Sequence, residues 1–233
     1  MPMESRPCPM TNFAFIHTSH VLIPLFSRLA REILPECETF HMTDESLIRN
    51  TIRAGHLTAT TKRRLISMVG SAREGGADAV MVTCSSIGEA AALARDLFDF
   101  PVFRIDEAMA RAAVQSGRRI GVAATLRTTL DPTIRLLKET AAISGQEIAV
   151  VPSLCEGAFE AVIAGDTERH DTILIESLNR LRSEVDVVVL AQASMARVVD
   201  RMHLDGGPQM LSSPELALRR AREVLLPERA AVK

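Results

Sequence analysis

The sequence contains no tryptophan or tyrosine and only 8 phenylalanines among its 233 residues. Proteins that bind single-stranded nucleic acid stack bases on aromatic side chains, and this chain offers few such platforms. Its formal net charge of −2 also provides no strong field to attract nucleic acid or an anionic membrane. We therefore expect neither kind of partner. The alanine, valine, leucine and isoleucine that make up the core are typical of a parallel α/β protein.

The four cysteines, Cys8, Cys37, Cys84 and Cys155, include no CxxC pair and no zinc-finger spacing. This pattern predicts free thiols in a reducing cytoplasm and no metal site. The sequence also lacks the glycine-rich patterns that bind nucleotide phosphates, so we expect no cofactor. No apolar run reaches a membrane-spanning length, and residues 1–10 do not resemble a signal peptide.

Short apolar runs alternate with longer stretches of helical period, which is typical of βαβ units around parallel sheets. The pattern predicts strands over residues 12–17, 37–41, 79–82, 101–105, 119–124, 147–151, 186–190 and 210–212. Among the helices between them, one is expected over residues 131–143, with Asp131 as its cap and Pro132 at its first position.

The most informative stretch is residues 78–86, a buried-strand pattern that ends in Thr-Cys-Ser-Ser. It recurs about 108 positions later in residues 186–194, where Gln192 stands at the position of Cys84. A second pair, residues 13–19 and 119–125, matches at a similar offset. These matches predict two similar half-domains with parallel sheets, each offering one residue to a shared cleft. If the halves face each other about a pseudo-twofold axis, their strand ends converge on that cleft.

Ligands of parallel sheets bind outside the carboxyl ends of the strands. Cys84 lies where a strand ends and a helix begins, and the free amides and dipole of a helix start predict a lowered pKa for its thiol. A thiolate there can move a proton at the carbon next to a carboxylate, or it can attack an electrophile. The alternative is that Cys84 is a small buried residue without chemistry.

The other candidates are short hydrogen-bonding residues at strand ends, which can bind a carboxylate but also cap helices routinely. They are Thr18, Ser19, Thr83, Ser85, Ser86, Thr125 and Ser194. His17 is a candidate proton donor or base, with a structural histidine as the alternative. Gln192 has no usable acid or base near neutral pH.

Four segments in order, residues 82–86, 119–125, 188–195 and 211–214, resemble the cofactor-independent aspartate/glutamate/hydantoin racemase superfamily. This superfamily also includes maleate isomerases and arylmalonate decarboxylases. The resemblance implies two Rossmann-like lobes with the active site in the cleft between them and, in the racemases, one cysteine from each lobe facing the substrate carbon. Cys84 matches the first cysteine, whereas Gln192 occupies the place of the second. Thr18, Ser19, Ser85, Ser86, Thr125 and Ser194 match positions that bind the substrate carboxylate.

The resemblance implies a cofactor-independent isomerase or racemase that acts next to the carboxylate of a small acid, such as an amino acid. Cys84 would be its lone thiol acid or base, and Gln192 would orient the substrate. His17 would cover the other face if the reaction is a racemisation, because a two-thiol mechanism is not available. The alternatives are a decarboxylase or other carbon–carbon lyase, and a non-catalytic carboxylate-binding protein.

We expect residues 1–106 plus 213–233 to form the first lobe and residues 107–212 to form the second. The expected partner is a small carboxylate-bearing substrate. The sequence leaves open whether copies of the chain form a homo-oligomer.

Overall fold

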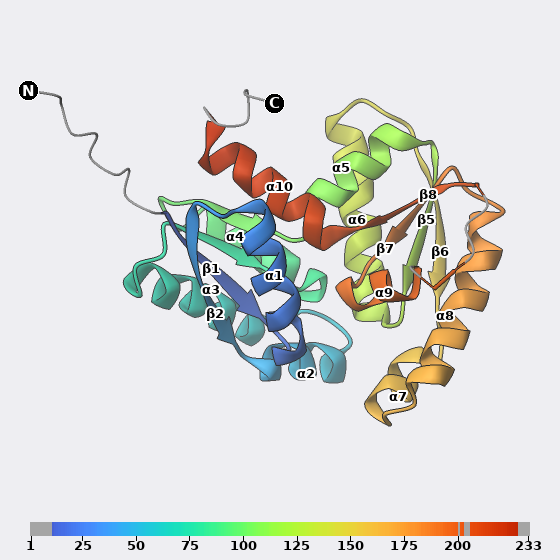
Figure 1. The fold of residues 1–233 in the computed structure, drawn as a ribbon, viewed down its shortest axis with the longest axis horizontal. Coiled ribbons are helices and arrows are strands. Elements are labelled where there is room, and N and C mark those ends of the chain that lie inside the picture. Colours follow the sequence, from blue (N-terminus) through green and yellow to red (C-terminus); the bar gives the residue numbers. More distant parts are fainter. Residues whose placement is uncertain (1–10, 200, 203–205, 228–233) are drawn as a thin grey trace, which may run out of the picture.

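The computed structural model describes residues 11–199, 201–202 and 206–227. Their strands form two four-stranded parallel sheets, flanked by helices, in two lobes (Figure 1). The first sheet contains β1 (Thr11–His17), β2 (Cys37–Thr43), β3 (Ala79–Val82) and β4 (Val102–Arg104). The second contains β5 (Arg119–Ala124), β6 (Ala149–Leu154), β7 (Val187–Leu190) and β8 (Gln209–Ser212). The predicted α/β fold with two similar lobes is confirmed.

The two sheets repeat one strand order. The first runs β2-β1-β3-β4 and the second runs β6-β5-β7-β8. β1 and β3, which carry the first members of the two sequence matches, therefore occupy the same places as β5 and β7. Cys84 is the second residue after the end of β3, and Gln192 is the second residue after the end of β7.

Helices cover both faces of the first sheet. α3 (Ala59–Glu74) and α4 (Gly88–Arg95) pack against one face, where Val80 and Val82 lie in the apolar core. α1 (Ile23–Ile33) and α10 (Ser213–Leu225) pack against the other face, around Phe13 and Phe15. α10 returns to the first sheet although it follows the second sheet in the chain (Figure 1).

The second sheet is covered in the same way. α5 (Glu107–Ser116) and α6 (Arg127–Ile143) share one apolar core with β5 and β7. α7 (Ala158–Ile163), α8 (Thr167–Arg182) and α9 (Ala196–Val199) contribute to the core on the opposite face. The residue boundaries of the lobes stay a prediction, and Cys8 lies outside the described residues. Within the described part of the chain, no helix combines the length and apolarity needed to span a bilayer.

Two helices near the carboxyl ends of the strands differ from the sequence prediction. α6 begins at Arg127, four residues before the predicted start, so that Pro132 lies inside it. The amides of Thr129 and Leu130 both bond to the carbonyl of Leu126, so the first turn is complete before the proline removes one hydrogen bond. α2 (Glu45–Ala54) was not predicted, because it is short and its sequence is mostly polar.

Candidate active site

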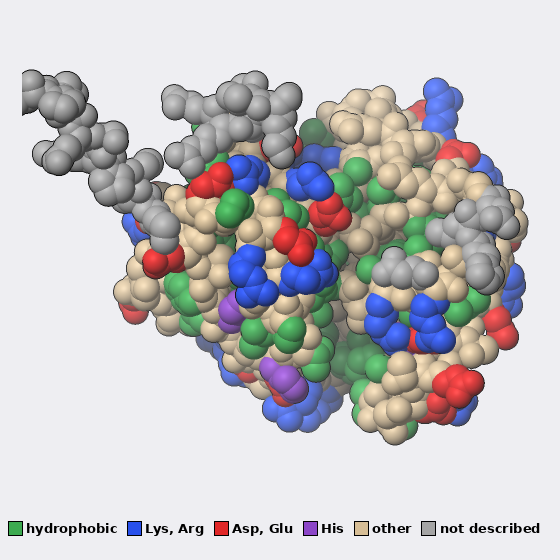
Figure 2. All heavy atoms as spheres, in the orientation of Figure 1, with side chains coloured by type: hydrophobic (Ala, Val, Ile, Leu, Met, Phe, Trp, Pro, Cys, Tyr) green, Lys and Arg blue, Asp and Glu red, His purple; other side chains and the backbone are tan. Residues whose placement is uncertain are grey.

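A cavity of about 430 Å³ lies between the two lobes, at the carboxyl ends of strands from both sheets. Figure 2 shows that the surface is hollowed between the two lobes and that hydrophobic side chains lie in this hollow. The cavity is lined by all but one of the predicted site residues, namely Thr18, Ser19, Thr83, Cys84, Ser85, Ser86, Thr125, Gln192 and Ser194. The exception is His17.

Cys84 lies on extended backbone two residues after the end of β3, and the short helix η2 (Ser85–Ile87) begins at the next residue. Its side chain is partly exposed to the cavity. Burial raises the pKa of the Cys84 thiol, and hydrogen bonds with Thr18, Ser86 and Ile87 offset this only in part. The predicted lowering of this pKa was therefore wrong, because desolvation of the thiolate outweighs the local amides. At neutral pH Cys84 carries its proton.

Hydroxyl groups from both lobes line the same cavity as the thiol. Ser86 of η2 bonds to Thr129 of α6 with 2.9 Å between the two oxygens, which joins the lobes at the floor of the cavity. Thr83 contributes less than its position suggests, since its hydroxyl is already committed. It donates to the carbonyl of Ile16 at 3.1 Å and lies 2.8 Å from Nδ1 of His17.

His17 is fully buried and belongs to a chain of polar groups behind the cavity. Because the Thr83 hydroxyl donates to Ile16, Nδ1 of His17 must be the donor to Thr83. Nε2 of His17 then accepts from Nδ1 of His41 at 2.9 Å, and Nε2 of His41 accepts from Ser27 at 2.9 Å. The structure thus places His17 away from the substrate side, in contrast to the predicted base on the second face.

This buried chain predicts a pH-dependent stability. Burial first, and then the charge of His41, lowers the pKa of His17 from 6.5 to about 4. The unfolded state therefore binds more protons between these values, and stability falls as pH drops through this window. We expect a loss of about 3 kcal/mol between pH 7 and pH 4 from this group, measured by urea unfolding.

The His17→Phe variant tests the assignment, because the ring stacks near Phe15 and Phe26 and the site accepts an aromatic side chain. Its stability should depend less on pH between 4 and 6.5. A His56→Phe variant is the matched control, since His56 is exposed. Equal slopes for wild type and His17→Phe would contradict the prediction.

Gln192 folds back onto its own lobe. Its side-chain oxygen accepts from the backbone amide of Thr125 at 2.7 Å and from the Thr125 hydroxyl at 3.1 Å. Nε2 of Gln192 lies 2.8 Å from the same hydroxyl. The side-chain oxygen of Gln192 thus accepts from the amide and hydroxyl of Thr125, two donors of the second lobe that could otherwise bind a ligand oxygen.

The sequence analysis missed a further set of wall residues. Apolar side chains from both lobes line the outer cavity, and among them Val21 is 64% and Val162 is 43% exposed. The others are Leu22, Ile48, Ile52, Ile105, Leu126, Phe159 and Ala191. Ile48 and Ile52 lie one helical turn apart on α2, and this spacing could have indicated an apolar helix face towards the cavity. The signal was missed because α2 itself was not predicted.

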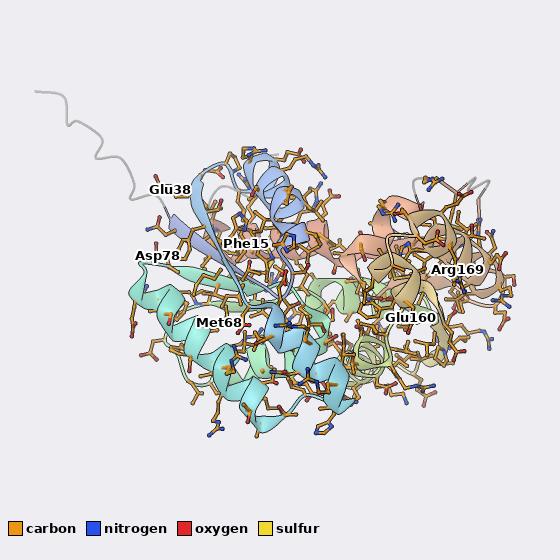
Figure 3. The ribbon with its side chains drawn as sticks, turned by 90° about the horizontal axis from the view of Figure 1, so that it is seen from below. Phe15, Glu38, Met68, Asp78, Glu160 and Arg169 are labelled. Carbon is orange, nitrogen blue, oxygen red and sulfur yellow. The ribbon has the colours of Figure 1, made fainter. Side chains whose placement is uncertain are left out.

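Charged and ionisable groups also reach the cavity, namely Glu45, Arg49, His170 and Arg197. His170 lies in the first turns of α8, next to Arg169, which is labelled in Figure 3. In the sequence, the acid Asp171 next to His170 was the signal that could have identified this histidine as a candidate. Within the described residues, no group of three or more His, Cys, Asp and Glu side chains is arranged to hold a metal ion.

The described residues thus form two α/β lobes with a hydroxyl-lined cavity between them, and Cys84 is the thiol among the lining residues. The chain belongs to the Asp/Glu/Hydantoin racemase family, which matches residues 16–221. A comparison with curated proteins finds no significant match.

Solved structures share the fold. A glutamate racemase isoform from Bacillus anthracis superposes with a TM-score of 0.71 at 17% identity, covering 94% of this chain and 82% of that one. An allantoin racemase from Klebsiella pneumoniae gives 0.64 at 18% identity, covering 94% and 89%. An aspartate racemase from Picrophilus torridus gives 0.64 at 13% identity, covering 92% and 94%.

Proposed function

We propose that this protein is a cofactor-independent isomerase of the racemase type that acts at the carbon next to the carboxylate of a small acid. The observation that carries the proposal is the position of Cys84, a lone thiol that faces an interlobe cavity among hydroxyl groups from both lobes. The membership of the chain in the racemase family supports the same reaction class.

Cys84 acts as a general acid. Because burial raises its pKa, the thiol holds its proton near neutral pH and can deliver it to a carbanion at the adjacent carbon. The carboxylate of the substrate is held by the hydroxyls of Thr18, Ser19 and Ser85, which line the cavity. The apolar outer wall favours an acid whose substituent is apolar.

A decarboxylase is the second candidate, and two observations favour it. Loss of carbon dioxide generates the carbanion without a base, so that only the Cys84 proton is needed afterwards. Gln192 supplies no acid or base, and the apolar wall disfavours the charge of a second carboxylate, which this reaction removes.

Incubation in deuterated water separates these candidates. Both enantiomers of leucine, phenylglycine, aspartate and glutamate should be tested beside phenylmalonate and methylmalonate. We expect deuterium at the α-carbon of an apolar amino acid together with loss of optical rotation, measured by mass spectrometry and polarimetry. Release of carbon dioxide from a malonate would favour the lyase. Absence of both reactions across the panel would count against catalysis and leave a carboxylate-binding protein.

A further inference from the structure

The second lobe has an ionisable group at the cavity that the sequence comparison does not assign. His170 is 3% exposed, lies on α8 and lines the same cavity as Cys84. Its Nδ1 is 2.8 Å from Oδ1 of Asp171. The fold therefore places an acid–histidine pair in the lobe whose predicted thiol position is held by Gln192.

Arginines fix the charge state of Asp171. Arg197 of α9 donates to both carboxylate oxygens, at 2.7 and 2.9 Å, and Arg201 donates to Oδ2. Although burial raises the pKa of Asp171, the hydrogen bonds from Arg197 and His170 lower it further, so that the group is ionised. An ionised carboxylate only accepts hydrogen bonds, so the 2.8 Å contact with Asp171 requires that Nδ1 of His170 carry the proton. Nη2 of Arg197 lies 3.4 Å from the same nitrogen, and since both groups are donors this longer approach is not a hydrogen bond in that tautomer.

This tautomer leaves the Nε2 lone pair of His170 free. Nε2 has no hydrogen-bond partner among the described residues. Among those residues, the one fully buried side-chain nitrogen or oxygen without a partner is Oγ1 of Thr128, so Nε2 of His170 is not fully buried. An imidazole held at Nδ1 by a carboxylate, in a side chain that lines a cavity, is the arrangement of a general base.

We propose that His170 is the second-lobe base of this site and works opposite Cys84. The inference rests on the proposed isomerase function. Nε2 removes the proton from the α-carbon of the acid, and the electron pair of that bond delocalises into the carboxylate. The Cys84 thiol then delivers its proton to the other face of the carbon. This leaves an imidazolium and a thiolate, and solvent carries the proton from the first to the second before the next turnover.

Iodoacetate tests this pair without knowledge of the substrate. The reagent carries a carboxylate beside an electrophilic carbon, so a bound molecule presents that carbon to both groups. In wild type at pH 9 we expect alkylation of Cys84 to be faster with iodoacetate than with neutral iodoacetamide. In the Cys84→Ser variant we expect iodoacetate to carboxymethylate Nε2 of His170 about tenfold faster than the exposed His56, as mapped by peptide mass spectrometry.

The outcomes separate the inference from the function on which it rests. If Cys84 of the wild type shows no preference for iodoacetate, the proposed carboxylate site fails. If Cys84 shows the preference but His170 of the Cys84→Ser variant reacts no faster than His56, only the inference fails. A His170 that merely holds Asp171 in place would give this second result, since such a role requires no access from the cavity.

A His170→Gln variant gives an independent readout in deuterated water. It should lose racemisation by about a hundredfold or more, because it lacks the base that removes the α-proton, while its Cys84 keeps the preference for iodoacetate over iodoacetamide. Full racemisation by His170→Gln would overturn the inference. Circular dichroism and urea unfolding of the variant check that its fold is intact.

Discussion

Replacing Cys84 by alanine is expected to lower the rate of α-deuterium incorporation into the product by about a thousandfold, within the range that a positioned acid or base contributes. In both proposed reactions the thiol is the proton donor, and the hydroxyls that line the same cavity are too weakly acidic to substitute. The measurement is mass-spectrometric deuterium uptake in the product, either the opposite enantiomer or the decarboxylated acid, that wild type forms most rapidly.

Cys37→Ala is the matched control for this variant. Cys37 is also a partly exposed free thiol, but it lies at the start of β2, away from the carboxyl ends of the strands. We expect Cys37→Ala to retain wild-type uptake. A Cys84→Ala enzyme with full uptake would contradict both the isomerase and the decarboxylase proposals, because each requires the Cys84 proton.

Replacing Arg104 by alanine is expected to destabilise the protein by about 3–5 kcal/mol. Arg104 of β4 and Asp106 form an ion pair in which the side chains are 6% and 0% exposed. Two hydrogen bonds of 3.1 Å join the guanidinium to the two carboxylate oxygens. Removal of the arginine would leave the carboxylate of Asp106 buried and unpaired. This carboxylate lies at the start of α5, where the chain passes from the first lobe to the second.

The double variant Arg104→Met, Asp106→Leu provides the control, because it removes both charges and retains apolar volume. Urea unfolding should show most of the lost stability restored in this variant. A loss below about 1 kcal/mol in Arg104→Ala would contradict the prediction and indicate that water reaches the pair.

The strands were predictable because their pattern is local. Four consecutive buried positions in β3 and in β7 stand out as apolar runs between turn residues, without knowledge of the rest of the chain. The limits of α6 were not predictable in the same way. Pro132 indicates a helix start by local rules, but packing of Leu130 in the second-lobe core extends the helix back towards the cavity.

The histidines show where sequence reasoning fails for the site. His17 shares a face of β1 with Phe13 and Phe15, but alternation does not tell which face of a fully buried strand meets the ligand. His170 is separated from Cys84 by most of a lobe in sequence. Its orientation depends on Asp171 and on Arg197, which comes from another helix.

The sequence by itself determined the parallel strands, the similarity of the two halves and the place of Cys84 at the end of a strand, since these follow from apolar period, local turn signals and the recurrence of residues 78–86 in residues 186–194. Only the tertiary structure decided the chemistry at that place. The protonation of Cys84 depends on how much protein surrounds it, and the roles of Gln192, His17 and His170 depend on partners from distant segments. Desolvation and side-chain hydrogen bonding are set by those three-dimensional neighbours, which no local pattern records.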